Sequence, residues 1–158
     1  MDAMDSLDYL MFSCLFIAIH TASYLLAGVL ALRISGDLYE ERNRVLDFLR
    51  DMSDPEESGH VSRYFIPAQL LRGLLMSVVL YPILGPLGEL SYPLQFAFFA
   101  GLMFVFTDFA CAVPFPNNIE GLVYMKRRYL KRKFFWKLYL ETAIYSVLFG
   151  LLAGLIIS

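Results

Sequence analysis

Four long apolar stretches, separated by polar segments, dominate the pattern of the sequence. Each stretch has about 20 residues or more, the length that an α-helix needs to cross a hydrocarbon layer of about 30 Å. Lipid offers the backbone no hydrogen-bonding partners, so such segments cross as helices, whose backbone bonds are internal. The pattern predicts one all-α integral membrane domain over residues 1–158. We expect a four-transmembrane-helix bundle with helices at about 9–32, 64–84, 94–113 and 134–157.

The composition supports this prediction. Apolar residues make up 58% of the chain and charged residues only 18%, whereas a soluble domain is about 45–50% apolar. A soluble bundle with an unusually apolar core is the alternative. We expect a multi-pass integral membrane protein, with the cell membrane as its location.

The basic residues are concentrated in two connections. Of the 13 Lys and Arg residues, five lie in 33–63 and seven in 126–137, and the remaining one is Arg72. Cytoplasmic segments of membrane proteins carry the excess of positive charge. We therefore expect the connections at about 33–63 and 114–133 to be cytoplasmic and both termini to lie on the non-cytoplasmic side.

The first of these connections contains a helical apolar stripe. Leu38, Val45, Leu49 and Met52 fall on one face at helical spacing, and most of the charged residues lie elsewhere. This pattern predicts an amphipathic helix that lies on the inner leaflet or packs under the bundle. A helix that docks a partner protein is the alternative.

The second connection mixes basic and aromatic residues beside an apolar span. This mixture is typical of an interface with anionic lipid headgroups, so we expect the anionic inner leaflet to be a partner. Specific recognition of a lipid or phosphate group is the alternative, and nucleic acid is not expected. The candidate headgroup contacts are Arg127, Arg128, Lys131, Arg132 and Lys133.

The segment "PNNIE" precedes this basic stretch. Asn117 is placed to cap a helix whose third residue, Glu120, reaches back to the amide of the capping residue. In the alternative interpretation, Asn117, Asn118 and Glu120 line the mouth of a binding site.

The last span contains two glycines, Gly150 and Gly154, at a spacing of four. Small residues at this spacing let membrane helices approach closely. The close approach is expected either within the bundle or between protomers of a homo-oligomer.

Each span also contains polar side chains that are costly in lipid. From the rise of 1.5 Å per residue, Asp108 lies about 21 Å from the outer end of its span, whereas Arg72 and Glu141 lie about 12 Å and 9–10 Å from the inner ends of theirs. All three therefore fall in the cytoplasmic half of the bilayer. Charged side chains in lipid turn toward one another or toward water, which predicts an enclosed polar cluster. His20, Gln69 and Tyr24 are expected around it.

The charges of this predicted cluster do not balance. Arg72 keeps its proton, so one positive charge faces two carboxylates, and full ionisation leaves a net charge of −1 in low dielectric. A protonated carboxyl, a protonated His20 or a bound cation restores the balance. Each of these outcomes describes a site that responds to protons or cations.

Three functions are compatible with such a cluster. We expect a protein that binds or transports a small polar, ionic or lipid ligand with proton or cation coupling. The alternatives are a membrane-embedded enzyme acting on a lipid or amphipathic substrate, and a structural subunit whose Arg–carboxylate pair holds the helices in register. The sequence has no HExxH motif, glycine-rich phosphate loop or nucleophile elbow, and it names neither a metal nor a cofactor.

Overall fold

A computed structural model describes residues 6–40, 44 and 46–157, and the side chain of Lys133 lies outside this description. The described residues form helices and no strand. Within them, four helical runs are long and apolar enough to cross a membrane, as the sequence predicted. These runs are α1 (Ser6–Tyr39); α2 (Pro55–Leu80) with η1 (Tyr81–Ile83) and α3 (Leu84–Gly88); α4 (Tyr92–Gly101) with the π-helical segment η2 (Leu102–Phe109); and α6 (Arg132–Ile157).

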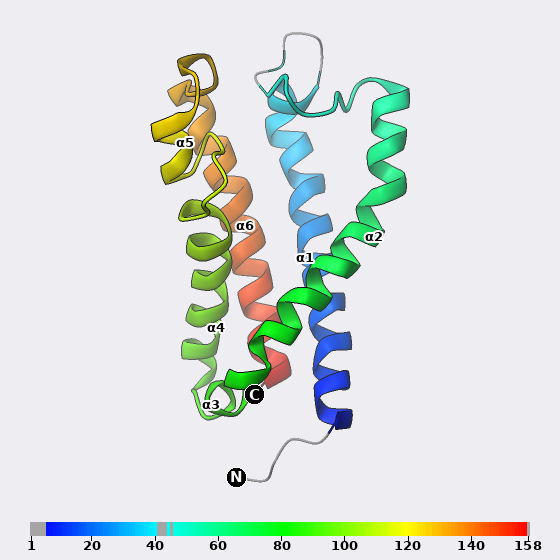
Figure 1. Cartoon of the computed structure of the whole chain (residues 1–158), viewed down its shortest axis with the longest axis vertical. Coiled ribbons are helices and arrows are strands. Elements are labelled where there is room, and N and C mark those ends of the chain that lie inside the picture. Colours follow the sequence, from blue (N-terminus) through cyan, green and yellow to red (C-terminus); the bar gives the residue numbers. More distant parts are fainter. Residues whose placement is uncertain (1–5, 41–43, 45, 158) are drawn as a thin grey trace.

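The two connections that carry most of the basic residues lie at the same end of the bundle. Figure 1 shows the start of α1 and the end of α6 at one end, and the short helix α5 (Ile119–Tyr124) at the other, beside the connection between α1 and α2. The 3-10 turn η3 (Arg127–Tyr129) follows α5. Successive long runs alternate in direction, so the first and third connections lie at one end, and the even number of runs brings both termini to the other.

Three span boundaries differ clearly from the prediction. The first span ends at Tyr39 rather than near residue 32. The second span begins at Pro55 rather than near residue 64, because the Asp54 carboxylate accepts hydrogen bonds from the amides of Glu56 and Glu57 at 2.8 and 3.0 Å and caps the helix. The third span ends at Phe109 rather than near residue 113, and the chain then follows a non-helical path.

The amphipathic helix predicted between the first two spans is not found among the described residues of that connection. Leu38 belongs to α1, whereas Leu49 and Met52 lie in turns, and Val45 lies outside the described residues. The prediction was wrong because the helical spacing of these apolar residues arises partly from the end of α1 and partly from a folded loop.

Side-chain bonds and a small apolar cluster hold this loop in its turns. The guanidinium of Arg44 donates to the carbonyl oxygen of Leu49 at 2.8 Å and forms an ion pair with Asp51 at 3.0 Å. Leu46 is buried against the end of α1 and the start of α6, in a cluster with Leu38, Phe134 and Leu138. The loop is therefore held by the bonds of Arg44 and by the burial of Leu46, without forming a helix.

The helices pack as a row rather than as a closed square. α6 packs against α1 on one side and α4 on the other, and α2 packs mainly against α1. At the crossing of α1 and α2, Gly73 faces the backbone of Ile17, and the hydroxyl of Ser77 donates to that of Ser13 at 2.9 Å. Beyond this crossing, the two helices diverge toward the connection end (Figure 1).

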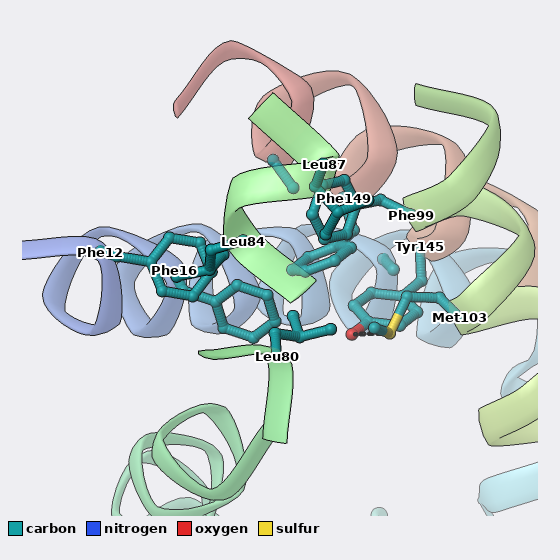
Figure 2. Packing of buried hydrophobic residues seen from close by; sticks show 11 residues of the cluster. Phe12, Phe16, Leu80, Leu84, Leu87, Phe99, Met103, Tyr145 and Phe149 are labelled. Carbon is teal, nitrogen blue, oxygen red and sulfur yellow. Dashed lines mark hydrogen bonds between the residues drawn. The ribbon is translucent and has the colours of Figure 1, made fainter. Parts of the chain in front are cut away.

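The main apolar core lies near the crossing and toward the end where the termini lie. Figure 2 shows rings from α1 and α6 meeting the aromatic and leucine side chains of the other helices. The ring of Phe149 makes edge contacts with those of Phe16 and Phe99, at centroid distances of 5.1 and 6.0 Å. These three rings are completely buried and bring α1, α4 and α6 together.

The small-residue face of α6 is used within the chain. A methyl group added at Gly150 would meet the Cβ and the backbone nitrogen of Ala100, each at 2.9 Å. A methyl group added at Gly154 would meet the ring of Tyr92 at 3.1 Å. The structure therefore places both glycines against α4, which is the first of the two alternatives that the sequence left open.

The Gly150→Ala substitution should destabilise the bundle by about 1–3 kcal/mol, because the backbone of α4 must move away from the new methyl group. Thermal unfolding of the purified protein in detergent measures this loss. Gly101→Ala is the matched control, since nothing lies within 4 Å of its added methyl group. Equal unfolding temperatures for the two variants would contradict the close α4–α6 contact.

Candidate functional site

A cavity of about 120 Å³ lies among four helical runs, near the level at which α1 and α2 diverge. Arg72, Asp108 and Glu141 all line it, as does Tyr24. The three ionisable side chains that the sequence placed at one depth therefore meet at one cavity. The rest of the lining consists of Ala27, Gly28, Met103, Thr107, Thr142 and Tyr145.

Asp108 lies in the last turn of the π-helical segment η2. In this wide turn, the amide of Ala110 donates to the carbonyl oxygen of Val105 at 2.7 Å. The carboxylate accepts one hydrogen bond from the side-chain amide of Asn117, at 2.8 Å, and another from the hydroxyl of Thr142. Two neighbouring segments thus hold its orientation, and π-helical turns are frequent at functional sites.

Glu141 reaches the same cavity from α6. Its Oε2 atom accepts a hydrogen bond from the hydroxyl of Tyr39 at 2.8 Å. Tyr39 ends α1, one turn beyond a kink at Ser35, whose backbone is not helical. The two residues are far apart in the sequence, so this bond ties the end of α1 to the middle of α6.

Arg72 is half-buried, and its guanidinium lies over the ring of Tyr24 at 5.4 Å from the centroid. Among the described residues, no ion pair within 4 Å joins Arg72 to Asp108 or Glu141. The alternative of an Arg–carboxylate pair that holds the helices together is therefore not observed. The carboxylates are oriented by neutral donors instead, and the cavity lies between the opposite charges.

His20 belongs to the wall behind the cavity rather than to its lining. It is completely buried, with Nδ1 at 2.7 Å from the hydroxyl of Tyr145 and Nε2 at 3.2 Å from the Oε1 atom of Gln69. An amide oxygen only accepts, so Nε2 carries the proton, and in the neutral ring Nδ1 is an acceptor for the hydroxyl of Tyr145. The same hydroxyl also lies 3.3 Å from the Sδ atom of Met103, so its one proton is shared between these two acceptors. His20 and Gln69 therefore position Tyr145, whose ring faces the cavity.

The three residues proposed for the mouth of a site have different positions. Asn117 is bonded directly to Asp108, and its own Oδ1 atom is buried without a hydrogen-bond partner among the described residues. Asn118, not Asn117, caps α5, because its Oδ1 accepts from the amide of Gly121 at 2.7 Å. Glu120 is half-buried in the first turn of α5. The predicted cap was wrong by one residue.

The bonds of Asn118 also explain the early end of the third span. Its side-chain amide donates to the carbonyl oxygen of Val113 at 2.7 Å, and its Oδ1 accepts from the amide of Phe115 at 3.0 Å. These bonds fold the chain after Phe109 into a compact turn. The turn brings the neighbouring Asn117 under the carboxylate of Asp108.

Two important contacts were not predicted from the sequence. Tyr39 lay in a predicted connection, so its bond to Glu141 had no signal in the sequence. Tyr145 did have one, because it follows Glu141 by four residues and residues four apart share a helix face. Thr142 follows Glu141 directly, and adjacent residues do not share a face, so its bond to Asp108 had no such signal.

The basic residues of the second connection lie on the outside of the protein. Arg127, Arg128, Lys131 and Arg132 are exposed, and Lys133 lies outside the described side chains. Arg128 is 3.8 Å from Asp47 of the first connection. Beside these residues, α5 exposes Leu122, Val123 and Tyr124. The segment thus combines positive charge with an uncovered apolar face.

The Tyr145→Phe substitution should lower stability by about 1–3 kcal/mol, because it leaves the Nδ1 atom of His20 buried without a donor. For a chain of this size the loss corresponds to a fall in unfolding temperature of about 2–4 °C per kcal/mol. Tyr139→Phe, on the same helix beside the ring of Phe109, is the control. An unchanged unfolding temperature for Tyr145→Phe would contradict a stabilising bond between His20 and Tyr145.

Metal ligation and similarity to known proteins add no further assignment to this site. Among the described residues, no group of three or more His, Cys, Asp or Glu side chains is arranged to hold a metal ion. No family model matches the chain, and neither a curated protein nor a solved structure shows significant similarity to it.

Proposed function

We propose that this membrane protein binds a small polar, ionic or lipid ligand in the cavity between α1, α2, η2 and α6. The observation that carries the proposal is that Arg72, Asp108 and Glu141 line one cavity without pairing with each other. A cavity needs only about 10–15 Å³ to hold one water molecule, so a volume of about 120 Å³ accommodates a ligand considerably larger than water.

The hydrogen-bonding capacity of the carboxylates supports this proposal. An ionised carboxylate accepts about four hydrogen bonds, whereas Asp108 receives two from side chains and Glu141 receives one. The remaining acceptor positions are available to a donor in the cavity. A ligand that carries an ammonium group would satisfy them.

The charge balance supports a positively charged partner. With all three groups ionised, the cavity holds one positive and two negative charges, and an excess charge in low dielectric is costly. A bound cation or a proton on one carboxyl removes the excess. Because both would act at the same carboxylates, ligand binding and protonation should compete, which is the physical basis for the proposed coupling.

Transport is part of the proposal because the cavity has two neighbouring hollows. Glu141 and Gly28 also line a groove of about 430 Å³ between the diverging halves of α1 and α2. Arg72 and Thr107 also line a hollow of about 400 Å³ on the other side of α2. Openings on both sides of α2 are suited to passage of a ligand past the charged groups.

We also propose an orientation of the bundle in the membrane. The clustered basic residues support a cytoplasmic position for the end that carries α5 and the first connection. The exposed arginines and lysines beside the apolar face of α5 support contact with anionic headgroups of the inner leaflet.

Methylammonium should raise the unfolding temperature of the purified protein at neutral pH. One-site binding gives about 2.7 kcal/mol at 100 times the dissociation constant, which corresponds to roughly 5–10 °C. The increase should disappear in Asp108→Asn and Glu141→Gln. It should also diminish at lower pH, because protons compete for the same carboxylates.

Two controls accompany the methylammonium measurement. Tetramethylammonium at equal ionic strength has no N–H donor and should stabilise the protein less. Glu89→Gln changes an exposed carboxylate beyond α3 and should keep the full methylammonium response. An equal response in the wild-type protein and both cavity variants would refute binding at this site.

The proposed orientation predicts opposite labelling of two introduced cysteines. In a chain with Cys14→Ser and Cys111→Ser, a membrane-impermeant maleimide should label Ser91→Cys on intact cells. Gly59→Cys should react only after permeabilisation, because it lies at the end that carries the basic connections. Labelling in the reverse order would show that the termini lie in the cytoplasm.

A further inference from the structure

An apolar groove leads from the cavity along the outside of the bundle. We call it the α2–η2 groove and define it by Leu75, Met76 and Val79 of α2 and by Leu102, Phe106 and Thr107 of η2. Its two hollows, of about 340 and 400 Å³, share Leu75, Met76 and Thr107. The lining is apolar apart from Arg72 and Thr107, which also line the cavity.

The groove exists because none of the described helices fills the space between α2 and η2. α2 packs mainly against α1, and η2 packs against α6. The exposed fractions of Leu75, Val79 and Phe106 are 60%, 76% and 76%. In a bilayer these side chains face hydrocarbon, so an acyl chain can lie in the groove without displacing water.

The groove and the cavity are continuous at one place. Arg72 and Thr107 line both the cavity and the hollow beside α2, and Met103 lines both the cavity and the deeper hollow. Glu141 lies on the other side of the cavity, where it borders the groove between α1 and α2. A molecule that enters from the α2–η2 groove thus reaches the positive charge before Glu141.

We propose that the ligand is a zwitterionic phospholipid with a primary amine in its headgroup. Its acyl chain lies in the α2–η2 groove, its phosphate contacts Arg72, and its ammonium group donates to Asp108 and Glu141. This inference rests on the proposed function, since it assigns a ligand class to the same cavity. The order of apolar, positive and negative surfaces matches the order of chain, phosphate and amine in such a lipid.

The groove has a defined direction relative to the two ends of the bundle. From Arg72 to Val79, α2 rises about 10 Å toward the end where the termini lie. η2 runs antiparallel to it, so Thr107 lies beside the cavity and Leu102 lies deeper. A headgroup at Arg72 therefore lies nearer the basic connections, and its chain points away from them, toward the end where the termini lie.

The chemistry of the cavity distinguishes between common headgroups. A primary ammonium has three N–H donors for the open acceptor positions of the two carboxylates, whereas a quaternary ammonium has none. A headgroup without an amine adds a negative phosphate to a cavity that already has an excess negative charge. Phosphoethanolamine lipids should therefore bind more tightly than phosphocholine or phosphoglycerol lipids.

Native mass spectrometry of the delipidated protein in detergent tests this order. Phosphatidylethanolamine, phosphatidylcholine and phosphatidylglycerol with identical acyl chains are supplied at equal mole fractions. We expect the protein to retain phosphatidylethanolamine at least tenfold more than the other two lipids. This preference should be lost in Arg72→Gln and Glu141→Gln. The controls Arg63→Gln and Glu89→Gln, at exposed positions, should keep it. Equal retention of the three lipids, or preference for another one, would overturn the inference.

A groove variant separates this inference from the proposed function. Leu75→Trp fills the α2–η2 groove, whereas Leu74→Trp changes its neighbour, which lines neither the groove nor the cavity. Leu75→Trp should lose phosphatidylethanolamine at least tenfold yet keep the response to methylammonium, and Leu74→Trp should keep both.

Each remaining outcome of this comparison has a separate meaning. If Leu75→Trp retains phosphatidylethanolamine as well as the wild-type protein does, the proposal that the acyl chain lies in the α2–η2 groove would be overturned. Binding of methylammonium or free phosphoethanolamine without selective binding of the lipid would overturn the lipid inference and leave the proposed function intact. If methylammonium does not stabilise the wild-type protein, that result would count against both the lipid inference and the proposed function.

Discussion

The interior of this protein depends on the cost of placing charge in hydrocarbon. Three ionisable side chains, Arg72, Asp108 and Glu141, lie within the apolar parts of three long helical runs. Lipid cannot solvate them, so each must find partners within the chain or face a cavity. The carboxylates find neutral donors in Asn117, Thr142 and Tyr39, and the guanidinium lies over an aromatic ring. The helices are consequently arranged around a cavity with charged walls.

The packing of α2 makes this cavity possible. Close approach at Gly73 brings α2 against α1 at a single crossing, beyond which the two helices diverge. If α2 ran parallel to α1 over its whole length, its arginine would have no space around it. The same geometry leaves α2 separated from η2, and this produces the outer groove. Cavity and groove therefore have one structural origin, a helix that packs mainly against one of its neighbours.

The sequence predicted the components of the site better than their partners. It placed Arg72, Asp108 and Glu141 at one depth, and all three line one cavity. It did not predict that Arg72 would be without a carboxylate partner, or that Tyr39 would bond to Glu141 from a segment expected to be a connection. His20 was expected near the cluster and was found behind it, bonded to Tyr145 and Gln69. The helix predicted in the first connection was wrong, because its apolar residues belong to α1 and to a loop.

The sequence by itself determined the number of candidate spans and brought Arg72, Asp108 and Glu141 to similar positions along them. Hydrophobicity and the rise per residue are local properties, so they can be read along the chain. Only the tertiary structure decided which side chains touch, where the helices diverge and that Gly150 and Gly154 face α4. These features depend on the rotation and crossing of whole helices, which are set by shape contacts between residues distant in the sequence.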